Sequence, residues 1–120
     1  MALTIEKKLA KKLIASYREL NTEPGGVGLK TPDGQFLNGF FIDRDSLDII
    51  LANPGVVGVS VHLAKHPSFP TGNERVLTIV FGGAEPNPDY KEGGNAAKYL
   101  NKLDVWDQVE PCPPVCSTIP

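Results

Sequence analysis

The stretch VVGVSVHLAKH, residues 56–66, alternates apolar and polar side chains over most of its length. Four large apolar residues fall on one side of an extended chain, and smaller or polar residues fall on the other: Val57, Val59, Val61 and Leu63 form the apolar set. Alternation with a period of two is typical of a β-strand that has one face in the core. We therefore predict a strand over residues 56–66, with the valine face buried and the opposite face open to solvent or to a partner.

A second apolar run follows at residues 76–81 and is hydrophobic at nearly every position. A run of this kind indicates a strand that is covered on both faces. The connection between the two runs, about nine residues long, is short for the crossover that a parallel pair needs. We therefore expect the two strands to be antiparallel neighbours.

Residues 4–20 contain the clearest helical pattern. Apolar side chains recur every three or four residues, which places them on one stripe of a helix: Ile5, Leu9, Leu13, Tyr17 and Leu20. Thr4 is the expected N-cap, because its hydroxyl can accept a hydrogen bond from an amide of the first turn. Docking of this stripe must outweigh the repulsion between the like-charged lysines of the same helix.

The remaining elements are shorter. Asp33-Gly34 predicts a loop or a short hairpin, and residues 36–42 a strand. Asp43 begins a short helix that ends at residues 53–55. After residue 81 we expect an irregular loop from residue 82 to residue 94. Asn95 is the expected N-cap of a last, short helix. The residues of this helix that we expect to face the core are Ala96, Tyr99, Leu100 and Leu103.

The order α-β-α-β-β-α predicts an α+β fold, with helices on one face of a small, mostly antiparallel sheet. A chain of 120 residues fits a single domain. Within it we expect an N-terminal amphipathic helix over residues 1–22, an α+β core over residues 23–103 and an irregular tail, rich in proline and cysteine, over residues 104–120.

The net charge of −2 argues against a general nucleic-acid binder, which needs a surplus of cations. Charge is nevertheless uneven: residues 1–20 carry +3 and the remainder −5. This asymmetry favours a solvated basic face, and it would also let the N-terminal segment of one copy meet the body of another. No secretory signal or membrane-spanning stretch is recognisable, so the sequence reads as cytoplasmic, without a membrane partner.

Both cysteines lie in the tail, at Cys112 and Cys116, separated by Pro113, Pro114 and Val115. In a polyproline conformation their Cα atoms would be ~12 Å apart, whereas a disulfide needs less than about 7 Å. A turn with Pro114 as its second residue would close that distance. A structural role, a disulfide and metal ligation all stay open, and a cytoplasmic location favours reduced or metal-bound thiols over a structural disulfide.

Two histidines together with the two cysteines suggest a Cys2His2 zinc site. In a strand, however, His62 and His66 are separated by roughly 13 Å, so sharing one ion would strain both rings. We therefore interpret them as surface histidines, and keep Cys112 and Cys116, with His62 or His66 as an additional ligand, as the candidate metal residues. No cofactor other than zinc is indicated.

The usual catalytic signatures are missing from the sequence. It contains no P-loop and no Gly-x-Ser-x-Gly motif. Asp43, Asp45 and Asp48 do not match a calcium loop, and helix capping explains them more simply. Gly82-Gly83 is compatible with a close backbone approach to a ligand, which leaves open an enzyme that uses the 82–94 loop and His62. Because no catalytic signature supports it, this is the least favoured alternative.

The run GFFIDRDSL (residues 39–47) and the tail CPPVC (residues 112–116) resemble motifs of small uncharacterised bacterial proteins. In those proteins a strand of the GFF or GFW kind precedes a short helix, and the chain ends in a CPPxC-type tail. The resemblance covers residues 36–116. It implies no activity, but it implies that the tail is an integral part of the domain.

Taken together, these features favour a non-enzymatic module that assembles with itself or binds another protein. The alternative is a metal-binding or redox-responsive protein centred on Cys112 and Cys116.

Overall fold

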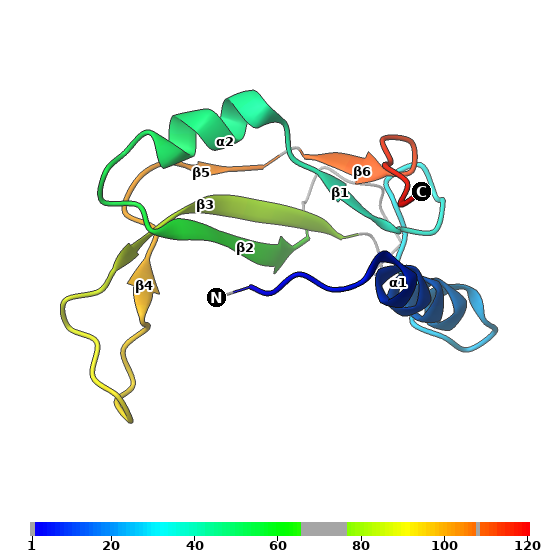
Figure 1. Cartoon of the computed structure of the whole chain (residues 1–120), viewed down its shortest axis with the longest axis horizontal. Coiled ribbons are helices and arrows are strands. Elements are labelled where there is room, and N and C mark those ends of the chain that lie inside the picture. Colours follow the sequence, from blue (N-terminus) through cyan, green and yellow to red (C-terminus); the bar gives the residue numbers. More distant parts are fainter. Residues whose placement is uncertain (1, 66–76, 108) are drawn as a thin grey trace. The chain divides into compact units, whose positions relative to one another are not determined.

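The computed structural model describes residues 2–65, 77–107 and 109–120. These residues form two helices and six strands (Figure 1), an α+β architecture with antiparallel sheets, as the sequence predicts. They divide into two compact units. The first unit contains residues 2–41, 77 and 110–120, and the second contains residues 42–65, 78–107 and 109. The expectation of a single domain stays a prediction.

The second unit is built on a four-stranded antiparallel sheet. Strand β2 (Gly58–Ala64) pairs with β3 (Thr78–Pro86), so the predicted antiparallel neighbours are confirmed. Two short strands, β4 (Tyr99–Leu100) and β5 (Val105–Trp106), pair with the opposite edge of β3. The central strand therefore has partners on both edges, and the core of this unit lies along it.

The valine face of β2 is less buried than predicted. Val57, Val61 and Leu63 are exposed, with 76% of Leu63 accessible to solvent. By contrast, Ile79 and Phe81 on the neighbouring strand are almost fully buried. The difference follows from position in the sheet, because β2 pairs with β3 alone and its side chains gain neighbours from one strand only.

Strand β3 runs through Gly82-Gly83, where the sequence predicts the start of a loop. A Cβ atom at Gly83 would lie 2.8 Å from Cγ2 of Val56 and 3.1 Å from Cγ2 of Ile50. The close packing of Ile50 and Val56 on the strand therefore explains why position 83 is a glycine. A ligand is not needed to account for it.

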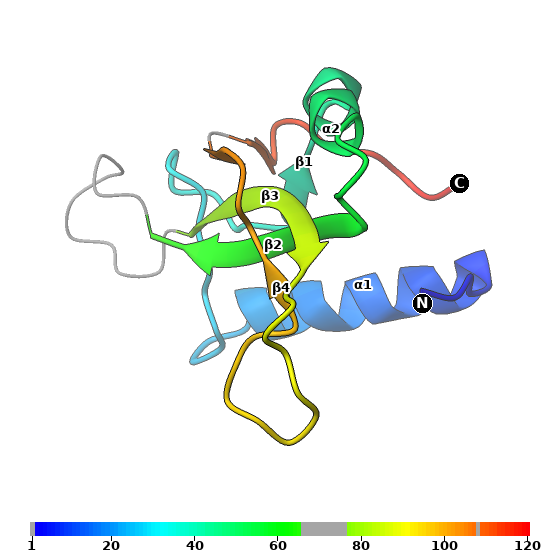
Figure 2. The same ribbon diagram turned by 90° about the vertical axis from the view of Figure 1, so that its left-hand side faces the viewer.

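Helix α2 (Arg44–Leu51) begins where the sequence predicts. Both carboxylate oxygens of Asp43 accept hydrogen bonds from Ser46, from the hydroxyl at 2.7 Å and from the backbone N–H at 2.9 Å. These bonds, with the hydroxyl first, lower the pKa of Asp43. Ile50 is buried, and α2 lies over β3 in both ribbon views (Figure 2).

The predicted last helix is wrong. Residues 99–100 form β4, and the backbone before it pairs with Asn87, whose N–H donates to the carbonyl of Lys98 at 3.0 Å. The side chain of Asn87 also donates to the carbonyl of Ala97 at 2.7 Å. These bonds between two segments of the chain pair the backbone carbonyls of residues 97 and 98, which in a helix would pair within the helix itself.

The first unit combines helix α1 (Lys7–Thr22) with a two-stranded sheet of β1 (Gly39–Phe41) and β6 (Glu110–Cys112). The helix begins three residues later than predicted, and Glu6, not Thr4, stands at the N-cap position without a side-chain bond. The predicted hairpin around Asp33-Gly34 is present, with Lys30 opposite Phe36 and a positive φ at Gly34.

Within the described ranges, neither helix is long and apolar enough to cross a membrane.

Asn21 connects α1 to the hairpin. Its side-chain oxygen accepts from the N–H of Leu29, and its amide group donates to the carbonyls of Leu29 at 3.1 Å and Leu37 at 3.2 Å. The hydroxyl of Tyr17 donates to the same Leu37 carbonyl at 2.6 Å, and burial raises the pKa of Tyr17. With 1% of its surface exposed, Asn21 is the most buried residue of the helix.

Replacing Asn21 with Ala should lower the free energy of unfolding by about 3 kcal/mol, because buried backbone groups lose their partners. Thr22→Ala is the control, since the Thr22 hydroxyl bonds the Arg18 carbonyl at the surface, and we expect a loss of about 0.5 kcal/mol or less there. Urea unfolding measures both variants. Equal losses would contradict the role assigned to Asn21.

Candidate functional site

Cys112 and Cys116 form a disulfide, with their Cα atoms 4.9 Å apart. The chain closes this distance by a turn in which the N–H of Val115 donates to the carbonyl of Pro111 at 3.1 Å. The peptide bonds that precede Pro113 and Pro114 are cis. The turn therefore begins two residues earlier than the Pro114-centred turn that the sequence suggests.

The structure shows the disulfide among the alternatives that the sequence leaves open, whereas a cytoplasmic location favours reduced or metal-bound thiols. Metal ligation by the reduced cysteines stays a prediction. Sulfur atoms bonded to each other are not thiolates, so the predicted metal ligands Cys112 and Cys116 are not available in this form. His62 belongs to the other unit, and His66 lies outside the described residues. The described residues contain no group of three or more His, Cys, Asp or Glu side chains placed to hold a metal ion.

The disulfide anchors the tail to the sheet of the first unit. Cys112 is buried and lies opposite Gly39, and its carbonyl accepts from the N–H of Asn38 at 2.7 Å. Cys116 is exposed. Residues 117–119, which follow directly, are therefore held close to a fixed strand.

These tail residues and one side of α1 line an open surface cavity of about 480 Å³, and six of its seven lining residues are exposed. The helix contributes Lys11, Ile14, Ala15 and Arg18, and the tail contributes Ser117, Thr118 and Ile119. Two cations, two hydroxyl groups and an apolar surface thus meet within one unit.

A different side of α1 carries the predicted apolar stripe, which is largely uncovered. Leu9, Leu13 and Leu20 are 45%, 55% and 49% exposed. The helix instead packs through Ala10, Tyr17 and Asn21, which lie along one neighbouring side. The expected docking of the whole stripe is therefore wrong. The hydrogen bonds of Tyr17 and Asn21 explain the exposure of the leucines, because they hold the side of α1 that carries Tyr17 and Asn21 against the hairpin. We call Leu9, Leu13 and Leu20 the leucine face.

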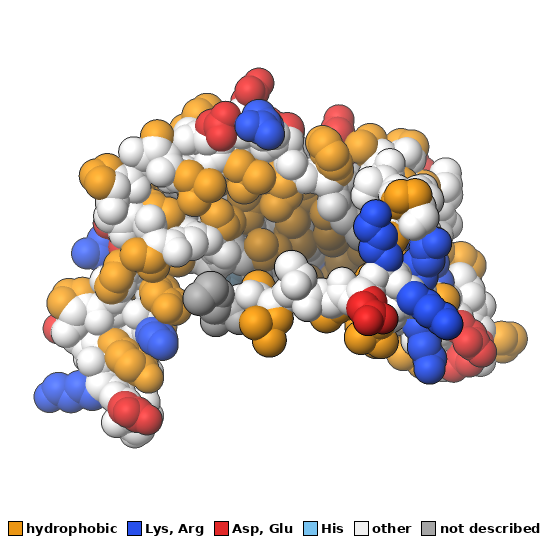
Figure 3. Space-filling view, in the orientation of Figure 1, with side chains coloured by type: hydrophobic (Ala, Val, Ile, Leu, Met, Phe, Trp, Pro, Cys, Tyr) orange, Lys and Arg blue, Asp and Glu red, His pale blue; other side chains and the backbone are white. Residues whose placement is uncertain are grey.

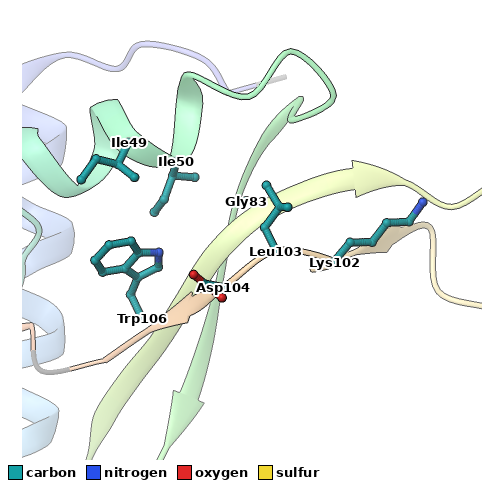
Figure 4. A pocket seen from close by; sticks show the side chains of 7 residues that line it. All are labelled: Ile49, Ile50, Gly83, Lys102, Leu103, Asp104 and Trp106. Atoms are coloured by element: carbon teal, nitrogen blue, oxygen red, sulfur yellow. The ribbon is translucent and has the colours of Figure 1, made fainter.

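The second unit has a groove of about 340 Å³ between α2 and β5. Figure 4 shows Trp106 reaching toward Ile50 of α2, while Lys102 points away from the indole ring. The charged residues that line the groove are Lys102 and Asp104. The rest of the lining is uncharged and mainly apolar, and it consists of Ile49, Ile50, Gly83, Leu103 and Trp106. Ile49 is 60% exposed. We call this the α2–β5 groove.

His62 is part of a polar cluster on the other face of the sheet. The side-chain amide of Asn101 donates to the hydroxyl of Ser60 at 2.7 Å and to the carbonyl of Gly83 at 2.9 Å. Its oxygen lies 3.0 Å from Nε2 of His62. Because an amide oxygen only accepts, Nε2 of His62 is the donor. This cluster joins Ser60 and His62 through an amide and gives the histidine no acidic partner of the kind that a catalytic triad needs.

Sequence reasoning missed Asn21, Asn101 and Trp106 as organising residues. An asparagine at the end of a helix is usually interpreted as a surface residue or a cap, and its burial becomes visible only with the tertiary contacts. Trp106 had one local signal, its place in a short apolar segment before the tail, but nothing in the sequence indicated α2 as its partner.

No protein family, curated protein or solved structure matches this chain. The resemblance of residues 36–116 to small bacterial proteins therefore stays a prediction.

Replacing both Cys112 and Cys116 with Ser should lower the free energy of unfolding by about 2 kcal/mol, because the unfolded chain gains the freedom of the opened loop. Urea unfolding of the variant and of the unreduced chain measures the difference. An intact mass that does not rise by two hydrogen atoms when the unfolded chain is reduced would contradict the disulfide.

Proposed function

We propose that this protein is a non-enzymatic self-assembly module in which α1 of one copy binds the α2–β5 groove of another. The observation that carries the proposal is the leucine face, three leucines on one side of a single helix that the described chain leaves about half exposed. Removing such side chains from water is favourable by about 1 kcal/mol or more each. Apolar side chains gathered on one helix face are also typical of interaction sites.

The α2–β5 groove offers apolar surface of matching kind. Ile49 is more than half exposed, and Leu103 and Trp106 extend the apolar lining across to β5. A helix that inserts leucines between two elements of a partner is a common mode of recognition. Figure 3 shows hydrophobic side chains gathered between α2 and β3.

Charge favours the same pairing. Lys and Arg side chains gather over α1 in Figure 3. Lys12 borders the leucine face, because it follows Leu9 by three positions on the same helix. The groove is bordered by Asp45, one turn before Ile49, and by Asp104, which lines it. Two leucine faces meeting each other would bring the Lys12 side chains together, whereas the groove has these two aspartates beside one lysine, Lys102.

This contact is heterologous, because the two surfaces that meet are different. Each copy then keeps one free helix and one free groove, and further copies can add until a ring closes or an open chain forms. The purified protein should therefore show masses above the monomer value of 12.9 kDa, increasing with concentration.

A mixing experiment tests the proposal. Leu13→Ser removes an apolar side chain from the leucine face but leaves the groove intact. Ile49→Ser alters the groove but leaves the leucine face intact. Each variant alone should be monomeric in sedimentation velocity, and an equimolar mixture should regain a dimer, because one intact surface of each kind remains. Leu63→Ser, at an exposed leucine of β2 outside both surfaces, should assemble like the wild type.

Two results would overturn this arrangement. A strictly monomeric wild type at millimolar concentration would exclude self-assembly, and a Leu63→Ser variant that alone loses assembly would place the contact on β2. Capture of a different protein by the leucine face, without self-association, would identify a protein-binding module of another kind.

A redox-responsive protein is the second candidate, and the exposed Cys116 of the disulfide favours it. A small dithiol reaches an exposed sulfur more readily than a buried one. In this case assembly measured with and without dithiothreitol should differ for the wild type and stay equal for the Cys112→Ser/Cys116→Ser variant. Equal assembly of the wild type in both conditions would contradict the redox response. Zinc binding by the reduced cysteines stays a prediction.

A further inference from the structure

The cavity between α1 and the tail contains two cations that the described chain leaves without acidic partners. Lys11 and Arg18 line it together, and the described residues include no carboxylate that pairs with either one. They are seven positions apart in the sequence, which corresponds to about 10 Å along a helix axis. Their long side chains can therefore converge on a group that lies over the helix between them.

The rest of the lining supplies hydroxyl donors and apolar surface. Ser117 and Thr118 face the cavity from the tail, and their hydroxyl groups make no bond to the described residues. Ile14 and Ala15 lie on the helix between the two cations, and Ile119 extends the apolar lining from the tail. The volume of about 480 Å³ falls in the range of small-molecule sites.

We propose that this cavity binds a small organic phosphate monoester. The three terminal oxygens of a phosphate can take the guanidinium group, the ammonium group and the two hydroxyl groups at once, whereas a carboxylate has only two oxygens. The apolar lining fits the organic part of such a ligand. Inorganic phosphate alone would leave that part of the cavity without a partner.

The disulfide contributes to this site by position. Ser117 follows Cys116, which is covalently joined to Cys112 of β6. Because the tail wall is tied to a strand, less ordering is needed when a ligand binds, and that preorganisation favours affinity. The site uses Lys11 and Arg18 and leaves the leucine face free, so it is independent of the proposed assembly.

Isothermal titration calorimetry of the full chain with phenyl phosphate, inorganic phosphate and benzoate tests the proposal. Phenyl phosphate should bind tightest, and the two others at least several-fold more weakly. Arg18→Gln and Lys11→Gln should each weaken phenyl phosphate binding about tenfold, because each removes a charge-assisted bond. Lys8→Gln is the control: it removes the same charge from the same helix but does not line the cavity, and it should stay within twofold of the wild type.

Amide resonances supply a second readout. Phenyl phosphate should shift the signals of residues 117–119 and of the middle of α1 in a nitrogen–proton correlation spectrum. No binding, or equal binding by wild type and Arg18→Gln, would overturn the proposal. Equal affinity for benzoate would overturn the phosphate class, and equal affinity for inorganic phosphate would overturn the apolar part of the ligand.

Discussion

The side chain of Asn21 determines how α1 is placed in the first unit. Its amide bonds the backbone of Leu29 and Leu37 in the hairpin, and Tyr17 adds a bond to the same Leu37 carbonyl. A buried amide of this kind fixes orientation more strictly than apolar packing, because each donor and acceptor has one direction in which it is satisfied. The helix consequently turns its polar residues inward and leaves leucines outside.

Both proposed surfaces follow from that orientation. With Tyr17 and Asn21 against the hairpin, the leucine face lies to one side and the Lys11–Arg18 side lies to the other, next to the disulfide-anchored tail. A single helix thus presents an apolar surface for a second copy and a cationic surface for a small anion. The second unit contributes the groove, where Trp106 on β5 faces Ile50 of α2.

Local patterns predicted the elements that depend on local chemistry. The antiparallel pair of β2 and β3, the Asp43 cap and the Asp33-Gly34 hairpin all follow from alternation, capping and turn residues, and the structure confirms them. The short strand at Tyr99 and the burial of Asn21 depend on partners distant in sequence, which a local pattern does not contain. The tail cysteines were identified as a candidate site, but the closure that joins them needs the turn at Pro111–Val115.

The pairing of α1 with the α2–β5 groove is tested most directly by a cross-link between two copies of the chain. Equal amounts of nitrogen-14 and nitrogen-15 protein would be mixed and treated with a carbodiimide, which joins an ammonium group to a neighbouring carboxylate. Binding of α1 to the α2–β5 groove predicts peptides of mixed isotope composition that join Lys12 of one copy to Asp45 or Asp104 of the other. Mixed peptides that join other sites, or no mixed peptides at all, would contradict the pairing of α1 with the α2–β5 groove.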